Sequence, residues 1–192
     1  MTEQPGTRIN LANFYPRNLF SRMLYRLPVL AWRLGLGPLT GRIILIVTAE
    51  GRKSGQPRSV PVEYVRYNGR KYAPVAFSEQ AQWYRNVLAN PLVTIQTSDG
   101  TETARASRVS ADEELVAVME AFMRSDPPLT RWYLKSLGIL PTRAEILANK
   151  ERVHILAFIP TEERAPHGLE VDLAWLWPLA LIWVGLRRKR RR

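Results

Sequence analysis

The chain has 192 residues, enough for one domain with a buried core that needs no disulfide or metal to hold it together. It contains no cysteine, which excludes disulfides, thiolate zinc sites, iron–sulfur clusters and a cysteine nucleophile. Hydrophobic residues make up 46% and charged residues 23%, values of an ordinary globular protein that argue against a disordered chain and against a polytopic membrane protein.

The net charge of +11 is concentrated at the two ends of the chain. Residues 1–42 carry six arginines and a single acidic residue, Glu3, and the last six residues, 187–192, are all basic. Residues 43–186 hold 16 basic and 16 acidic residues and are therefore neutral. A nucleic-acid-binding domain carries its positive charge on the folded domain itself, so we expect no nucleic-acid partner.

The first predicted element is an amphipathic N-terminal arm, residues 1–41. Large apolar side chains recur at helical spacing between Asn10 and Leu36, which predicts a helical hairpin or a helix kinked at Pro28. The arm either packs over the core with its arginines in water or lies on anionic lipid. The arginines beside the apolar stripe are Arg22, Arg26 and Arg33.

Residues 42–160 form the predicted central domain and have a strand-rich pattern. Turn signals such as Asn68-Gly69 separate runs of β-branched and aromatic residues, predicting an α+β fold whose strands make a small closed or half-closed barrel. Six strands are expected, at 43–48, 58–67, 71–77, 92–97, 101–109 and 153–159. Helices are expected over 79–89, from a capping box at 110–113 through Met123, and in further segments up to Lys150.

The last predicted element is a hydrophobic C-terminal helix with a basic tail, within residues 161–192. The run from Leu173 to Leu186 has 14 uncharged residues, too few to cross a bilayer, which needs about 20. Its tryptophans and the basic tail suit a lipid headgroup layer. We therefore expect a membrane-surface anchor, with docking on the domain, docking on a homodimer partner, or a short span as alternatives. No signal peptide is recognised in the first ten residues, which predicts a cytoplasmic protein peripheral to the inner face of the membrane.

The segment most suggestive of chemistry is residues 51–58, GRKSGQPR, between two predicted strands. Arg52, Lys53 and Arg58 place three cations within seven residues, and two glycines allow a close backbone approach. Ser54 adds a hydroxyl, and exposed amides of such a turn can form an anion-binding nest. An anion-binding loop is the functional interpretation, and a solvated hairpin tip is the structural alternative.

Two long motifs in this region resemble a known family. The runs VTAEGRKSGQPRSVPVEYVRYNGRKY and QWYRNVLANPLVTIQ are similar to those of the deazaflavin-dependent nitroreductase family, reductases that use reduced coenzyme F420. The resemblance covers residues 42–110 well and extends more weakly to 153–160. It implies a split β-barrel and an F420H2-dependent oxidoreductase of the quinone or nitro reductase type, and several family members associate with membranes.

The resemblance also implies roles for individual residues. Ser78 and Trp83 match positions that line the deazaflavin pocket, and Asn86 lies in the same motif with no role assigned. Tyr133 lies in the region of the family's substrate-side tyrosines, and it is expected to act as a proton donor or as a wall of the acceptor pocket. The residues matching positions that hold the phosphate and acidic tail of F420 are Arg52, Lys53, Ser54, Gly55 and Arg58.

The expected reaction is hydride transfer from reduced F420 to a lipophilic acceptor such as a quinone, nitroaromatic or enone. Glu79 stands where family members often carry a lysine, and a carboxylate there repels an anionic tail, so FMN is the alternative cofactor. An FMN-binding split-barrel oxidoreductase and a non-catalytic cofactor- or lipid-binding protein are the alternative functions. His154 and His167 lack the spacing of a zinc motif, and no metal site is expected.

Overall fold

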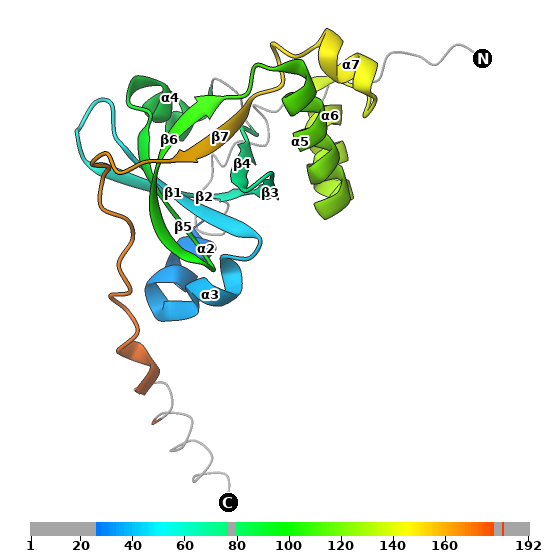
Figure 1. The fold of residues 1–192 in the computed structure, drawn as a ribbon. Helices are drawn as coiled ribbons and strands as arrows, with labels where there is room; N and C mark the ends of the chain where they lie inside the picture. Colours follow the sequence, from blue (N-terminus) through cyan, green and yellow to red (C-terminus); the bar gives the residue numbers. More distant parts are fainter. Residues whose placement is uncertain (1–25, 77–79, 179–181, 183–192) are drawn as a thin grey trace, which may run out of the picture.

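The computed structural model describes residues 26–76, 80–178 and 182. These residues form a curled antiparallel sheet with helices on its outside (Figure 1). The strands are β1 (Ile44–Glu50), β2 (Pro57–Glu63), β3 (Val65–Tyr67), β4 (Arg70–Pro74), β5 (Leu92–Thr97), β6 (Gly100–Arg108) and β7 (Ile155–Pro160). The helices are α2 (Leu27–Ala31), the π-helix η2 (Trp32–Leu36), α3 (Gly37–Thr40), α4 (Gln82–Ala89), α5 (Asp112–Ser125), α6 (Pro127–Leu137) and α7 (Arg143–Ala148).

The order of the strands explains why the sheet curls. It runs β2-β1-β5-β6-β7-β4-β3, so β2 and β3 are the two edges of the sheet. These edge strands are consecutive in the chain, and only Tyr64 separates them. Because one residue spans only about 3.3 Å, the two edges must meet at Tyr64. The α+β class is confirmed, and the sheet is a barrel that stays unclosed between β2 and β3.

The expected six strands are corrected to seven in the described residues, because the predicted strand 58–67 breaks at Tyr64. The Tyr64 ring is buried and its hydroxyl donates to the carbonyl of Gly41 at 2.9 Å. The chain bends there, so that β2 pairs with β1 while β3 pairs with β4. The β3–β4 turn is as predicted, since Asn68 and Gly69 both have positive φ, 46° and 75°, as a type I′ hairpin requires.

Two apolar clusters stabilise the fold. One fills the inside of the barrel, where Leu45, Ile95 and Phe158 are almost completely buried. The other packs the outer face of the sheet against α5 and α6, around Leu115 and Phe122. Figure 1 shows these two helices together beside β3 and β4, at one end of the barrel. β2 also ends there, next to β3.

The helix predicted from 110 through Met123 is confirmed as α5, but the capping box predicted at 110–113 is wrong. α5 begins at Asp112, its N-cap is Ala111, and no side chain caps it, because Ser110 lies one residue too early. The acidic side chains of the first turn complement the helix dipole instead. α6 does have a side-chain cap, since Asp126 accepts a hydrogen bond from the N–H of Leu129 at 3.0 Å.

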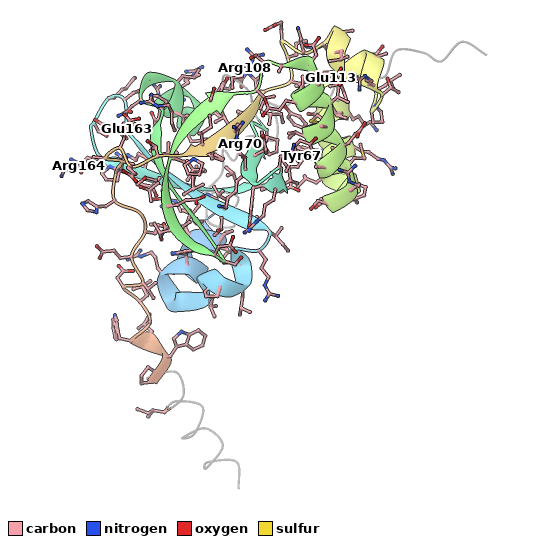
Figure 2. The ribbon with its side chains drawn as sticks, viewed as in Figure 1. Tyr67, Arg70, Arg108, Glu113, Glu163 and Arg164 are labelled. Atoms are coloured by element: carbon pink, nitrogen blue, oxygen red, sulfur yellow. The ribbon has the colours of Figure 1, made fainter. Side chains whose placement is uncertain are left out.

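Exposed ion pairs join elements that are distant in the sequence. Glu113 at the start of α5 accepts from Arg143 of α7 at 2.6 Å, and Arg108 at the end of β6 pairs with the Glu151 carboxylate at 3.4 Å. Figure 2 shows Arg108 and Glu113 at the same end of the molecule as α7. Solvent screens such pairs, so they fix local geometry and add little to stability.

The two ends of the described chain lie against each other. The guanidinium of Arg33 in η2 binds both carboxylate oxygens of Asp172, at 2.8 and 2.5 Å, and Trp177 Nε1 donates to the Leu34 carbonyl at 2.8 Å. Gly35, with φ of 84°, kinks the N-terminal helices here, and a side chain at this position would meet Val171. The kink therefore lies at Gly35. Pro28 is in the first turn of α2, in agreement with the usual place of proline in a helix.

Part of each terminal prediction lies outside the described residues. Residues 1–25, which include Arg22, lie outside the described residues. In the C-terminal segment, residues 176–178 are helical, and beyond them only residue 182 is described. No helix in the described ranges is long and apolar enough to cross a membrane. The amphipathic arm and the hydrophobic helix stay predictions in those parts.

Candidate functional site

The loop between β1 and β2, residues 51–56, is a tight hairpin connection. The Gly51 N–H donates to the Gln56 carbonyl at 2.9 Å, and the N–H groups of Ser54 and Gly55 both donate to the Gly51 carbonyl, at 3.0 and 2.7 Å. Gly55 has φ of 65°, in the region that glycine adopts without strain. These bonds occupy the amides of Gly51, Ser54 and Gly55 within the hairpin itself. They leave fewer amides for the expected anion-binding nest, which stays a prediction, so the side chains are the clearer candidates for contact with an anion.

Arg52 is fixed to α4 by two uncharged amide groups. Its Nη1 donates to Asn86 Oδ1 at 3.0 Å, its Nη2 donates to Gln82 Oε1 at 2.9 Å, and its backbone N–H donates to Asn86 Oδ1 at 3.3 Å. Asn86 lies in the family motif without an assigned role, and Gln82 was not among the predicted site residues. Helical spacing is the sequence signal that could have indicated a role for Asn86, because Asn86 follows Trp83 by three residues and falls on the same side of the helix.

Lys53 and Arg58 carry the rest of the positive charge of this segment. Both side chains are exposed, and neither has a hydrogen bond or an ion pair with another residue in the described ranges. The amide partners of Arg52 cannot cancel its charge. The neighbouring carboxylate of Glu50 is held by Asn90 Nδ2 at 2.9 Å. The hairpin of residues 51–58, called the basic hairpin below, thus keeps a surplus of positive charge for an anion.

The basic hairpin borders a cavity of about 970 Å³. Residues of β2 and of the end of β4 line it together with parts of α4, α5 and α6, so it follows the unclosed side of the barrel. Gly55 does not line the cavity and serves the turn, and Ser78 lies outside the described residues. The other residues predicted for the site all line it, namely Arg52, Lys53, Ser54, Arg58, Trp83 and Tyr133.

The walls of the cavity beyond the basic hairpin are mostly apolar and aromatic. Val60 and Val62 come from β2, and Phe122 and Trp132 come from α5 and α6. Trp83 is half-buried and its ring lies edge-on to Tyr84, with centroids 6.3 Å apart. A cavity with cations at one end and flat apolar walls behind them suits a ligand with an anionic tail and an aromatic ring.

Tyr133 is buried beside the cavity, and its hydroxyl is bound to the backbone. The hydroxyl donates to the His154 carbonyl at 3.4 Å and accepts from the His154 N–H at 3.1 Å. Burial of the side chain raises the pKa of Tyr133 well above its ordinary value. This geometry supports the pocket-wall interpretation, and a proton-donating role for Tyr133 stays a prediction.

Glu63 is a cavity residue that the sequence analysis missed. It ends β2 and is half-buried. Burial is the main cause that raises its pKa to about 7, and the nearby negative charge of Asp126 adds to it. The sequence signal that could have indicated Glu63 is a lone carboxylate between apolar neighbours in a predicted strand. Nothing in the local pattern could indicate Asp126, which is 63 positions away in the chain.

His154 is a packed core residue. Its side chain is buried, its Nδ1 lies 3.2 Å from the Tyr84 hydroxyl, and the two rings meet at 70° with centroids 5.5 Å apart. In the described ranges, no group of three or more His, Cys, Asp or Glu side chains could hold a metal ion. His154 therefore supports the wall behind Tyr133 and Tyr84.

Several solved structures are similar to this chain at low identity. The F420-H2 dependent reductase FDR-A is 24% identical, covers 61% of this chain and 94% of its own, and has a TM-score of 0.45. The haem storage protein HutZ from Vibrio cholerae is 16% identical, with coverage of 76% and 97% and a TM-score of 0.48. A putative 5-nitroimidazole antibiotic resistance protein from Bacteroides thetaiotaomicron is 13% identical, with coverage of 68% and 80% and a TM-score of 0.46.

A family model gives the assignment. The model described as F420H(2)-dependent quinone reductase matches residues 33–131, just over half of the chain. The match includes the basic hairpin and α4, whereas Tyr133 falls just beyond it. The chain belongs to the F420H2-dependent quinone reductase family, a family of oxidoreductases whose cofactor is F420.

Proposed function

We propose that this protein transfers a hydride from reduced F420 to a lipophilic acceptor of the quinone class, with nitroaromatics and enones as further substrates. The observation that carries this proposal is a single cavity that combines an uncompensated cationic hairpin with apolar, aromatic walls. A quinone ring needs such walls, and the anionic tail of the cofactor needs such a hairpin.

The residues present fit F420. Its tail has a phosphodiester and several carboxylates, which are best bound by cations without carboxylate partners. Arg52 has only amide partners, and Lys53 and Arg58 have no partner in the described ranges. Ser54 lines the same side of the cavity and adds a hydroxyl. Ser78 and Trp83 complete the proposed cofactor set, with Trp83 beside the ring.

The protein's own part in the reaction is to bind, to orient and to exclude water. When bound, reduced F420 supplies the hydride. Trp83, Val60 and Val62 are proposed as the wall against which a flat ring is held, and Phe122 and Trp132 add further aromatic lining. Tyr133 is proposed as a rigid part of the acceptor pocket, because its hydroxyl is fixed by the His154 backbone.

The experiment is a direct one. Purified full-length protein is mixed with reduced F420 and a soluble quinone analogue, and the return of oxidised F420 absorbance is followed. Arg52→Ala, Lys53→Ala and Arg58→Ala together should raise the F420 dissociation constant by at least tenfold. Lys135→Ala, an exposed cation of α6 that does not line the cavity, is the control and should leave it unchanged. An unaltered constant in the triple variant contradicts the cofactor site.

Two alternatives to this function can be recognised experimentally. FMN has one phosphate and asks for less positive charge than the basic hairpin offers, so F420 is favoured. The absorbance and mass of whatever copurifies with the protein separate the two cofactors. Binding of F420 without reduction of any acceptor favours the alternative of a non-catalytic carrier.

The two ends of the described chain meet where Arg33 and Leu34 contact Asp172 and Trp177, and they are called the joined ends below. We also propose that these joined ends rest on the inner face of the cell membrane, which would bring the cavity to a lipid-dissolved acceptor. Large apolar side chains are exposed on both ends, with Leu39 at 69% and Trp175 at 60% exposed. The basic residues 187–192 add attraction to anionic lipid. Assembly as a homodimer, which would cover the same surface, is the alternative use of these side chains.

Sedimentation with vesicles tests this surface. Leu39→Ser combined with Trp175→Ser should reduce binding to anionic vesicles several-fold. The control is Leu88→Ser, because Leu88 is 60% exposed on α4 and does not belong to the joined ends. Equal binding of both variants, or equal binding to neutral vesicles, contradicts the membrane proposal, and a change in molar mass in solution identifies the dimer.

A further inference from the structure

Glu63 occupies the end of the cavity away from the basic hairpin. It is the last residue of β2, and Arg58 lies five residues earlier in the same extended strand, which separates them by roughly 16 Å. Glu63 is half-buried, and apolar residues such as Phe122 and Leu129 line the same cavity. If the anionic tail of the cofactor binds the basic hairpin, Glu63 lies toward the other end of the cavity, which stays free for an acceptor.

The surroundings of Glu63 favour its protonated form. Its carboxyl has no hydrogen bond or ion pair with a residue in the described ranges. It faces the negative charge of Asp126, the residue before α6. Arg26, the residue before α2, lines the same cavity and forms no ion pair with Glu63 in the described ranges. The cavity-lining residues of β1, β4 and α5 carry no charge, namely Ile44, Pro74, Met119 and Phe122.

Reduction of a quinone needs a proton as well as a hydride. The hydride brings two electrons and one hydrogen to the acceptor, and the resulting anion must take up one proton to become the hydroquinone. Oxidised F420 is left after loss of that hydride and of one proton to solvent, so the overall reaction transfers two hydrogens and two electrons. A neutral carboxyl next to the acceptor can provide the proton and be reprotonated from solvent.

We propose that Glu63 is the catalytic acid that donates this proton to the acceptor, an inference that rests on the proposed reductase function. Tyr133 is less suited to the task, because its hydroxyl is held by the backbone of His154. The carboxyl of Glu63 is unpaired and lines the cavity at the acceptor end. Its pKa, raised to about 7, means that a substantial fraction of Glu63 is protonated near neutral pH.

The first test compares Glu63→Gln with the unaltered protein. The rate of acceptor reduction by the unaltered protein should fall as the pH rises through about 7, as Glu63 loses its proton. Glu63→Gln should lower kcat by about a hundredfold, remove this pH dependence and leave the F420 dissociation constant unchanged. Glu63→Asp should restore part of the rate, and Tyr133→Phe should keep the pH dependence.

The second test does not depend on turnover. The full-length protein, labelled with ¹³C-glutamate and free of cofactor, should give one carboxyl resonance that titrates near pH 7 and is absent from Glu63→Gln. Asp126→Asn keeps the oxygen that caps α6 but removes the charge that faces Glu63. This variant should move the resonance and the pH dependence of the rate to lower pH by the same amount.

The outcomes separate this proposal from the function on which it rests. Unaltered rate and pH dependence in Glu63→Gln, or a Glu63 resonance that titrates near 4.5, overturns the role of Glu63 alone. A shift of the resonance in Asp126→Asn without a shift of the rate profile does the same, because another group then sets the profile. Absence of both F420 binding and turnover in the unaltered protein overturns the proposed function itself.

Discussion

Arg52 and Asn86 are 34 residues apart in the chain and form the contact that holds the basic hairpin to α4. Asn86 Oδ1 accepts both from the guanidinium, at 3.0 Å, and from the Arg52 backbone N–H, at 3.3 Å. The acceptor is an uncharged amide, so the contact fixes the direction of the arginine and leaves its charge for a ligand. A carboxylate in the same place would fix the side chain and cancel the charge.

Replacement of Asn86 by Asp tests this distinction. The two side chains have the same shape, and Asn86→Asp keeps the acceptor for Arg52, so the fold should be retained. The added carboxylate neutralises Arg52, and we expect the F420 dissociation constant to rise about tenfold, equivalent to about 1.4 kcal/mol. Fluorescence titration with F420 measures the constant.

Asn90→Asp is the matched control for this change, because Asn90 lies one turn later and binds Glu50 rather than a cation. It should disturb the end of β1 without directly neutralising Arg52. If Asn86→Asp binds F420 as tightly as the unaltered protein, the charge of Arg52 has no part in holding the tail.

The raised pKa of Glu63 predicts how stability depends on pH. The folded protein keeps the proton of Glu63 up to about pH 7, whereas the unfolded chain loses it near 4.5. The stability contribution of this group is therefore complete below 4.5 and is lost as the pH rises through about 7. Glu63→Gln has no such loss, so the melting temperature of the variant relative to the unaltered protein should rise between pH 5 and pH 8.

Glu162→Gln provides the reference for this measurement, since Glu162 is exposed after β7. Its melting temperature relative to the unaltered protein should stay constant over the same range. A constant difference for Glu63→Gln as well would mean that the folded state does not hold an extra proton on Glu63.

The ion pair between Arg33 and Asp172 predicts a local effect rather than a global one. Both side chains are more than 40% exposed, so solvent screens the pair and it adds little to stability. Asp172→Arg should leave the melting temperature within a few degrees. It should also raise hydrogen exchange at residues 172–177, which contact η2 through Asp172, Leu173 and Trp177.

Charge reversal of both partners, Arg33→Asp with Asp172→Arg, should restore much of the protection from exchange. Equal exchange in the single and double variants would show that two other bonds hold the two ends together without the ion pair. These are the bond from the Trp177 indole to the Leu34 carbonyl and the backbone bond from Leu173 to Arg33.

The sequence alone was sufficient to predict those features of this protein that depend on residues close together in the chain. Asn68-Gly69 adopts the two positive φ angles that its turn requires, and the strand patterns are confirmed within a few residues. The family motifs located the basic hairpin, and its cations do border the cavity. Such features follow from residues within a few positions of one another, because turn geometry and side-chain alternation are local properties.

The tertiary structure alone decided the features that depend on distant residues. Tyr64 breaks a predicted strand because its ring is buried and its hydroxyl reaches Gly41, and Asn86 acquires a role because Arg52 lies beside it. The pKa of Glu63 depends on burial and on Asp126. A side chain's dielectric surroundings, charged neighbours and hydrogen-bond partners are set by what packs against it, and these contacts come from parts of the chain that only folding brings together.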